Sequence, residues 1–275
     1  MSGGAHGPAA RESVHGTAAR GRARGGGGGT TTGTGGWRVV VPVKPAAVGK
    51  SRLAVDGVDR TALARAVALD TIEAAARASR VTEVIVVTAD ETLRDELRGW
   101  PEGAAPEGPD ARMPEIPRAP DDSGRRDPAF AGSPALGTGR APVRVVREAE
   151  PAGLDAAVRA GLAAVPADRP RAVLLGDLPA LRPSDLDAAL VLAGIVDRGL
   201  VPDAEGTGTT LVTARASIPL SPAFGTDSAA RHRAAGHVDL DVGASSTLRR
   251  DVDTAAQLAA ALALGAGPRT AALLG

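Results

Sequence analysis

The stretch VVVPVKPAAVGKSRLA, residues 39 to 54, is a β-branched apolar run followed within a few residues by a Gly-Lys-Ser triplet. A P-loop would need a glycine five positions before Gly49, and that position holds Lys44. Lysine does not readily take the positive-φ backbone that glycine adopts at little cost. The stretch is therefore a strand that leads into a loop of another kind.

The chain around this stretch alternates between strand-like and helix-like patterns. Apolar runs of strand length stand at 37–43, 83–90, 143–148 and 171–181, and helix-spaced apolar residues at 60–79, 153–165 and 182–193. Strands that alternate with helices of ten or more residues are typical of βαβ units. We predict an α/β fold in one doubly wound domain, with a mostly parallel sheet and helices on both faces. Ser184 and Asp253 are the expected N-caps of helices at 182–193 and 254–265.

Two segments interrupt the alternation. Residues 1–36 carry 13 of the 35 glycines and are predicted to be a disordered leader, because such a segment buries too little apolar surface to offset its ordering entropy. Residues 99–142 carry 9 of the 21 prolines and show no periodicity. We interpret them as a disordered insertion within a domain spanning 37–275, and a linker between two domains is the alternative.

Composition narrows the function. The 275 residues include 32 basic and 32 acidic side chains and no cysteine. Balanced charge gives no reason to expect nucleic acid or an anionic membrane as a partner. Without thiolates, and with only four histidines, a metal is most easily held by aspartate oxygens, which suits Mg²⁺. No run is apolar enough to cross a bilayer and no secretory signal is present, so we expect a cytoplasmic protein.

Ligands of doubly wound sheets gather where the strands end, so the residues after each strand matter most. The first strand is followed by three cations, Lys44, Lys50 and Arg52, with no acidic residue before Asp56. Such a cluster can be an ordinary solvated loop. Pro45, Gly49 and short alanines between the cations favour a loop pressed against a triphosphate.

Two aspartates are candidate metal ligands. Asp177 follows the strand RAVLLG, and Asp251 stands two residues before Asp253 in LRRDVDT. A carboxylate in either place can equally form a turn or cap a helix. If Asp253 is the helix cap, Asp251 is the better metal ligand, paired with Asp177 across the sheet.

A second anion site is indicated by GTGTTLVT and FGTDSAARH. The first contains Gly206 and Gly208 before a strand through Thr210, and the second places Gly225 before a helix that begins near Ser228. Free N–H groups at a helix start bind anions, although ordinary capping gives the same pattern. A cationic loop, two carboxylates and a second anion pocket together favour an enzyme that joins two phosphorylated substrates at one Mg²⁺.

The ordered motifs VPVKPAAVGKSRLA, LLGDLPAL, GTGTTL, FGTDSAARH and LRRDVDT resemble those of the CofC/FbiD family, the guanylyltransferases of deazaflavin coenzyme biosynthesis. The resemblance covers residues 37 to about 265, apart from the proline-rich segment. It implies a Rossmann-like nucleotidyltransferase fold, like that of the molybdenum-cofactor guanylyltransferases. It also implies Mg²⁺-dependent transfer of GMP from GTP to a three-carbon phosphorylated acid.

The resemblance also implies roles for single residues. Asp177 and Asp251 would hold the metal, while Thr210, Gly225 and Ser228 would receive the carboxylate of the acceptor. Our own mechanistic hypothesis, based on the cationic loop, adds that Lys44, Lys50 and Arg52 take the β- and γ-phosphates of GTP. One departure is Asp155, where family members often carry asparagine; aspartate can accept a hydrogen bond there but cannot donate one.

Several questions stay open at the level of sequence. The acceptor is expected to be phosphoenolpyruvate, because the Ala-, Arg- and Gly-rich composition suggests an actinobacterial source; 2-phospho-L-lactate and 3-phosphoglycerate are alternatives. A molybdopterin guanylyltransferase and a non-catalytic nucleotide-binding regulator are the other classes considered. The paired aspartates favour an enzyme over a regulator. Nothing in the sequence indicates the oligomeric state.

Overall fold

The valines of the opening stretch form β1 (Trp37–Val43), a buried strand that pairs in parallel with β2 (Val81–Thr88) and with β4 (Arg171–Leu174). The structure is a computed structural model that describes residues 36–45, 53, 55–100, 139–148, 150 and 152–275. Successive side chains of a strand point to opposite faces of the sheet. β1 therefore contributes to the core on both sides.

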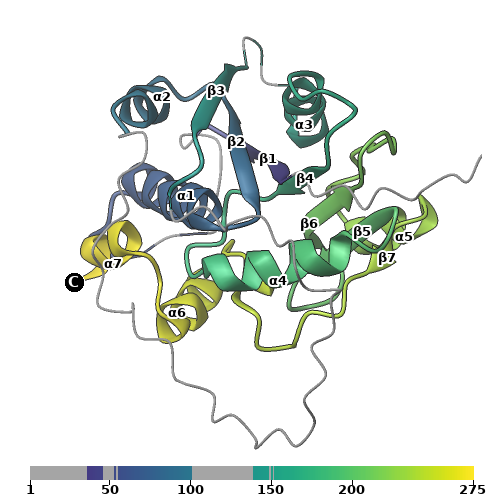
Figure 1. Ribbon diagram of the computed structural model, residues 1–275. Coiled ribbons are helices and arrows are strands. Elements are labelled where there is room, and N and C mark those ends of the chain that lie inside the picture. Colours follow the sequence, from purple (N-terminus) through teal and green to yellow (C-terminus); the bar gives the residue numbers. More distant parts are fainter. Residues whose placement is uncertain (1–35, 46–52, 54, 101–138, 149, 151) are drawn as a thin grey trace, which may run out of the picture. The chain divides into compact units, whose positions relative to one another are not determined.

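The sheet has seven strands in the order β3-β2-β1-β4-β6-β5-β7 (Figure 1). The strands not yet given are β3 (Val143–Arg147), β5 (Arg198–Pro202), β6 (Thr209–Ala214) and β7 (Val238–Asp239). β6 runs antiparallel to both of its neighbours, and the other described pairings are parallel. The predicted mostly parallel α/β fold is confirmed.

Helices cover both faces of this sheet (Figure 1). On one face α1 (Arg60–Arg77) and α4 (Pro183–Ala193) pack against Val39 and Val41 of β1. On the other face α3 (Leu154–Ala163) and α5 (Ser228–Ala234) pack in a second core that includes Val40. A Cβ on Gly161 of α3 would lie 2.3 Å from a methyl carbon of Val40, so only glycine permits this close approach.

A third, smaller core forms where the carboxyl ends of the strands meet the C-terminal helices. α6 (Ala255–Leu264) contributes Leu258 and Ala261, which pack with Leu63 of α1 and with the fully buried Val252. α7 (Pro268–Leu274) follows and packs against α1. Because side chains alternate along an extended segment, burial of Val252 turns Asp251 and Asp253, its two neighbours, away from this core.

The proline-rich segment lies between α2 (Glu91–Arg98) and β3, and the strands on either side of it, β2 and β3, are adjacent in one sheet. Residues 1–35 and 101–138 lie outside the described part of the chain. The predicted leader and insertion, and the bounds of the predicted domain, therefore stay predictions.

Two predicted helix caps are wrong. The N-cap of α4 is Arg182, and Pro183 occupies the first turn, where its missing N–H costs nothing, so Ser184 lies inside the helix. α6 is capped by Thr254, whose hydroxyl accepts from the backbone N–H of Gln257 in a capping box. Asp253 instead precedes the cap, and its side chain lines a cavity at the edge of the sheet.

No helix in the described ranges of the chain has both the length and the apolar character that a membrane span requires.

We predict that Thr254→Ala lowers the free energy of unfolding by about 1 kcal/mol, because it removes the α6 cap. Asp253→Ala should lower it by less, because Asp253 is not the cap. Urea unfolding of both variants measures the difference. A larger loss for Asp253→Ala than for Thr254→Ala would contradict the assignment.

Candidate active site

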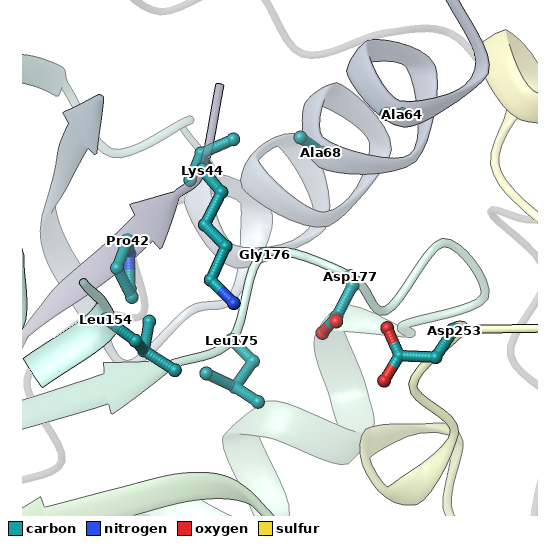
Figure 2. Close-up of a pocket in the computed structure, with 10 residues that line it drawn as sticks. Pro42, Lys44, Ala64, Ala68, Leu154, Leu175, Gly176, Asp177 and Asp253 are labelled. Carbon is teal, nitrogen blue, oxygen red and sulfur yellow. The ribbon is translucent and has the colours of Figure 1, made fainter. Parts of the chain in front are cut away.

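A cavity of about 110 Å³ lies at the carboxyl ends of β1 and β4. Its lining includes Lys44 from the end of β1, Asp177 from the loop after β4, and Asp253. Figure 2 shows the carboxylate of Asp253 pointing toward that of Asp177, with the side chain of Lys44 extending into the same cavity. The sequence-based expectation that ligand-binding groups gather at this edge agrees with this placement.

The loop that carries Asp177 is held on three sides. A Cβ on Gly176 would lie 3.0 Å from a methyl carbon of Val43, so the loop passes close over the end of β1. The hydroxyl of Thr71 in α1 accepts a hydrogen bond from the N–H of Leu178 at 3.0 Å. The carbonyl of Asp177 accepts from the N–H of Val252, also at 3.0 Å, which brings the 251–253 segment to the site. Asp177 is thus positioned by backbone geometry.

Asp251 lies within a crowd of negative charge. Burial, followed by the nearby carboxylates of Asp177, Asp203 and Asp253 in that order, raises the pKa of Asp251 to about 7. Its Oδ1 is buried and accepts no hydrogen bond from the described residues. A buried carboxylate oxygen without a donor, beside three like charges, is unfavourable unless a cation is bound.

Two further carboxylates at this edge were missed at the level of sequence. Asp203 and Glu205 follow β5, and each places an oxygen within 4.8 Å of an Asp251 oxygen and of the other. The sequence pattern did not predict β5 as a strand, so the residues VPDAEG at its end are not among the predicted ligands. The rule that ligands gather where strands end would have found Asp203, since it follows the apolar run of residues 200–202.

Asp203 also shapes its own loop. Its two carboxylate oxygens accept from the backbone N–H groups of Thr207 at 3.0 Å and Gly208 at 2.7 Å. A Cβ on Gly208 would lie 2.2 Å from Asp203 Oδ2, so glycine is required there. Asp203 is therefore partly neutralised by backbone donors, and Asp251 is the group most in need of a cation.

The donor set suits a divalent metal. Oxygen ligands alone, several of them charged, are what Mg²⁺ and similar hard cations prefer. The orphaned Oδ1 of Asp251 and its raised pKa are the observations that favour a bound cation over a purely structural cluster. Asp251 belongs to the triad with Asp203 and Glu205, and it also feels the charge of Asp177.

The predicted acceptor pocket lies on the next strand. The carbonyl of Thr210 in β6 accepts from the N–H of Leu175, one residue before Gly176, so β6 begins beside the Asp177 loop. The hydroxyl of Thr210 donates to the carbonyl of Val201 at 3.3 Å. Ser228, at the start of α5, hydrogen-bonds through its hydroxyl to Thr209, the neighbour of Thr210, at 3.2 Å.

Gly225 precedes α5 in a conformation that requires glycine, with φ of +104°. The preceding loop is fixed by Asp155 of α3, whose Oδ1 accepts from the N–H of Phe224 at 3.0 Å. Asp155 thus acts here as a hydrogen-bond acceptor. A carboxylate can fill this role, because the side chain does not have to donate a hydrogen bond. α5 itself has seven residues, so a helix-dipole contribution to anion binding is small.

Not every predicted site residue can be placed. Lys44, Asp177, Asp251, Thr210, Gly225 and Ser228 all lie among the described residues, at or next to the carboxyl edge of the sheet. Lys50 and Arg52 lie outside the described residues, so their predicted contact with the triphosphate stays a prediction.

The raised pKa of Asp251 predicts a pH-dependent stability that can be measured. Between about pH 4 and pH 7 the folded protein holds a proton that the unfolded chain has released, so this group's stabilising contribution is lost as pH rises through about 7. In EDTA, the melting temperature of the wild type should fall more between pH 5.5 and pH 8 than that of Asp251→Asn. Differential scanning calorimetry measures both.

The control is Asp168→Asn, at a solvent-exposed aspartate beside Arg169. It should keep the pH dependence of the wild type. If the melting temperatures of Asp251→Asn and of the wild type depend equally on pH, the pKa of Asp251 is not raised in the folded protein.

Comparison with known proteins identifies the family. The chain is 43% identical over 238 residues to a phosphoenolpyruvate guanylyltransferase of Thermomonospora curvata, covering 86% of this chain and 88% of that protein. It is 47% identical over 249 residues to one of Sanguibacter keddieii, covering 86% and 84%. A third, from Streptomyces coelicolor, is 42% identical over 243 residues, covering 86% and 95%.

No protein-family model matches the chain. Among solved structures, a nucleotidyl transferase from Methanothermobacter is 17% identical, with a TM-score of 0.47, over 83% of this chain and 97% of that one. Because this TM-score is below 0.5, we assign the fold from the strand order and the strand directions of this chain alone. From its curated relatives, the chain belongs to the phosphoenolpyruvate guanylyltransferase family, the CofC/FbiD family that its motifs resemble.

Proposed function

We propose that this protein transfers GMP from GTP to phosphoenolpyruvate and releases pyrophosphate, with Mg²⁺ as the metal. The observation that supports the proposal is the carboxylate cluster around Asp251, which is close to the charges of Asp177 and Asp253, two residues that line a cavity together with Lys44. Membership of a family whose curated relatives are named phosphoenolpyruvate guanylyltransferase supports the choice of nucleotide and acceptor.

In the proposed reaction a phosphate oxygen of phosphoenolpyruvate attacks the α-phosphorus of GTP. The bond between the α-phosphorus and the oxygen that bridges to the β-phosphorus breaks, and that oxygen leaves with pyrophosphate. The product is enolpyruvyl-diphospho-guanosine. An acceptor phosphate is already ionised at neutral pH, so no general base is needed. The main task of the protein is to align two polyanions that repel each other.

Asp177 and Asp251 are the residues that we propose hold Mg²⁺, with Asp203 and Glu205 close by. A bound Mg²⁺ would neutralise charge on the reacting phosphates. Asp177 is fixed by its loop and Asp251 by the burial of Val252, so both carboxylates are in place before a substrate arrives. Such preorganisation lowers the reorganisation cost of the reaction.

Cationic side chains would bind the triphosphate. Lys44 extends into the cavity beside Asp177, and Lys50 and Arg52 follow it in the sequence. These three would neutralise the β- and γ-phosphates and the charge that develops on pyrophosphate. The Gly-Lys-Ser triplet would then act through side-chain charge and not through a backbone cradle.

The carboxylate of the acceptor would be received by Thr210, Gly225 and Ser228. Ser228 contributes a hydroxyl, and Gly225 lets the backbone come close to the ligand without a side chain in the way. We place the reaction in deazaflavin coenzyme biosynthesis in the cytoplasm, in keeping with the motifs that the chain shares with that family.

The direct test is pyrophosphate release from GTP and Mg²⁺ with phosphoenolpyruvate, 2-phospho-L-lactate or 3-phosphoglycerate in parallel. We expect release with phosphoenolpyruvate and confirmation of the product by mass spectrometry. Asp177→Asn and Asp251→Asn should each lower turnover by about two orders of magnitude or more, because each removes a charge from the metal site.

Release with another acceptor only would overturn the choice of phosphoenolpyruvate and keep the nucleotidyltransferase. Near-normal turnover in both aspartate variants, each with an unchanged circular dichroism spectrum, would contradict the proposed metal ligands.

The role of Lys44 gives a separate prediction. Lys44→Ala should raise the KM for GTP by about tenfold, which corresponds to the loss of one charge-assisted contact of about 1.4 kcal/mol. Steady-state kinetics with phosphoenolpyruvate held at saturation measures it. Arg60→Ala, at an exposed position at the start of α1, is the matched control and should leave the KM unchanged. Equal values for Lys44→Ala and the control would remove Lys44 from the site.

A further inference from the structure

We infer that His232 of α5 is a positioning residue for the acceptor pocket. Held as the neutral Nδ1–H tautomer, it fixes the loop before Gly225 and orders a chain of hydroxyls so that Ser228 can donate to the carboxylate of the acceptor. The inference rests on the proposed function, since it concerns the pocket that would receive phosphoenolpyruvate.

The imidazole of His232 is fully buried, and both of its nitrogens have partners. Nε2 accepts from the backbone N–H of Ala223 at 3.2 Å, and Nδ1 lies 3.1 Å from the hydroxyl oxygen of Thr209. A backbone N–H can only donate, so Nε2 must carry a lone pair. A neutral ring then carries its proton on Nδ1 and donates it to Thr209.

The surroundings of the ring favour the neutral form. Burial, with smaller contributions from the neighbouring His237 and Arg231, lowers the pKa of His232 to about 4, although Asp155 and a hydrogen bond to the backbone of Ser228 act in the opposite direction. A protonated ring would turn Nε2 into a donor that faces the Ala223 N–H, and the loop would lose its anchor. The hydrogen bonds and the neighbouring charges therefore both favour the neutral form of the His232 ring.

The proton on Nδ1 sets the direction of the hydroxyl chain. Thr209 accepts from His232, so the hydroxyl hydrogen of Thr209 can be donated to Ser228, whose oxygen lies 3.2 Å away. In the structure the Ser228 hydroxyl donates to Thr209, so the chain reverses at Ser228 when the acceptor binds. When the carboxylate of the acceptor binds, His232 Nδ1–H donates to Thr209, and Thr209 donates to Ser228. The hydroxyl hydrogen of Ser228 is then available for the carboxylate.

His232 also holds the loop that carries Gly225. Two consecutive backbone N–H groups are anchored there, that of Ala223 by His232 and that of Phe224 by Asp155. The guanidinium of Arg231 donates to the carbonyl of Phe224 at 2.6 Å. Since α5 supplies two of these three anchors, one helix sets both the Ser228 hydroxyl and the approach to Gly225.

A neighbouring histidine shows what a purely structural role looks like. His237 is also buried, and its ring contacts that of His232 edge-on with centroids 5.3 Å apart. Its Nδ1 lies 3.0 Å from the carbonyl of His232, while its Nε2 has no hydrogen-bond partner among the described residues. His237 has no bond to the loop or to the hydroxyl chain, so it is a matched control.

Two amide substitutions separate the two functions of the ring. The amide nitrogen of His232→Asn can occupy the place of Nδ1 and donate to Thr209, but it provides no acceptor for Ala223. The amide oxygen of His232→Gln can occupy the place of Nε2 and accept from Ala223, but it provides no donor for Thr209. Each variant should raise the KM for phosphoenolpyruvate by about tenfold, the cost of about one lost hydrogen bond.

The expected signature is a split between the two substrates. The KM for GTP should change less than about twofold in both variants, because the triphosphate cations lie elsewhere. His237→Asn, which keeps a donor at Nδ1, should lower the melting temperature to a similar extent with no change in either KM. An unchanged KM for phosphoenolpyruvate in both His232 variants, or an equal rise for both substrates, would overturn the inference.

The wild type separates this inference from the proposed function. No pyrophosphate release with phosphoenolpyruvate in the wild type would refute the function and the inference together. Normal wild-type activity with unaffected His232 variants would refute the inference alone. Independently of activity, ¹⁵N NMR of the histidine ring should show a proton on Nδ1 of His232, and a proton on Nε2 would contradict the assigned tautomer.

Discussion

The arrangement of the site depends on the mutual repulsion of carboxylates that the fold forces together. Asp251 is half-buried, has a buried oxygen without a donor among the described residues, and lies near three other aspartates. Like charges at such proximity are unfavourable in a low-dielectric setting unless a cation compensates them. The backbone nevertheless holds them there, through the Val252 N–H on the carbonyl of Asp177 and the two N–H groups on Asp203. This repulsion lowers the stability of the folded protein, and a bound metal ion would compensate it.

The fold divides the chemistry between two parts of one sheet edge. The ends of β1 and β4 bring Lys44 and Asp177 to a cavity, and β6 and α5 carry Thr210 and Ser228, which we propose receive the acceptor. The two parts are joined where Leu175 donates to the carbonyl of Thr210. The reversal of β6 within a mostly parallel sheet places its amino end, with Thr209 and Thr210, at the edge where β4 ends. An antiparallel strand therefore completes a site that parallel strands begin.

Much of the fold could be predicted from the sequence, because the strongest patterns lie in the core. The valine run of β1 and the helix-spaced residues of α1 and α3 are buried on the faces that the pattern indicates. The same positions allowed Asp177 to be placed at the end of a strand. What could not be predicted were elements with weak local patterns: β5, which contains a glycine and ends in a proline, and the two-residue β7.

The elements that the sequence did not predict carry residues of the candidate site. Because β5 was not predicted, Asp203 and Glu205 were not assigned to it. The capping error arose because Asp253 and Thr254 are both good N-caps, and only the three-dimensional path of the segment decides between them. The role of His232 depends on which backbone N–H it meets, and that partner is nine residues away in sequence. Tertiary contacts of this kind have no local signature.

The most direct test of the central claim is anomalous diffraction from crystals of the protein grown with Mn²⁺ and a non-hydrolysable GTP analogue. The account predicts an anomalous peak within coordination distance of carboxylate oxygens of Asp177 and Asp251, with the α-phosphate of the analogue beside it. Bound nucleotide with no metal at these aspartates, or metal bound only elsewhere on the chain, would contradict it.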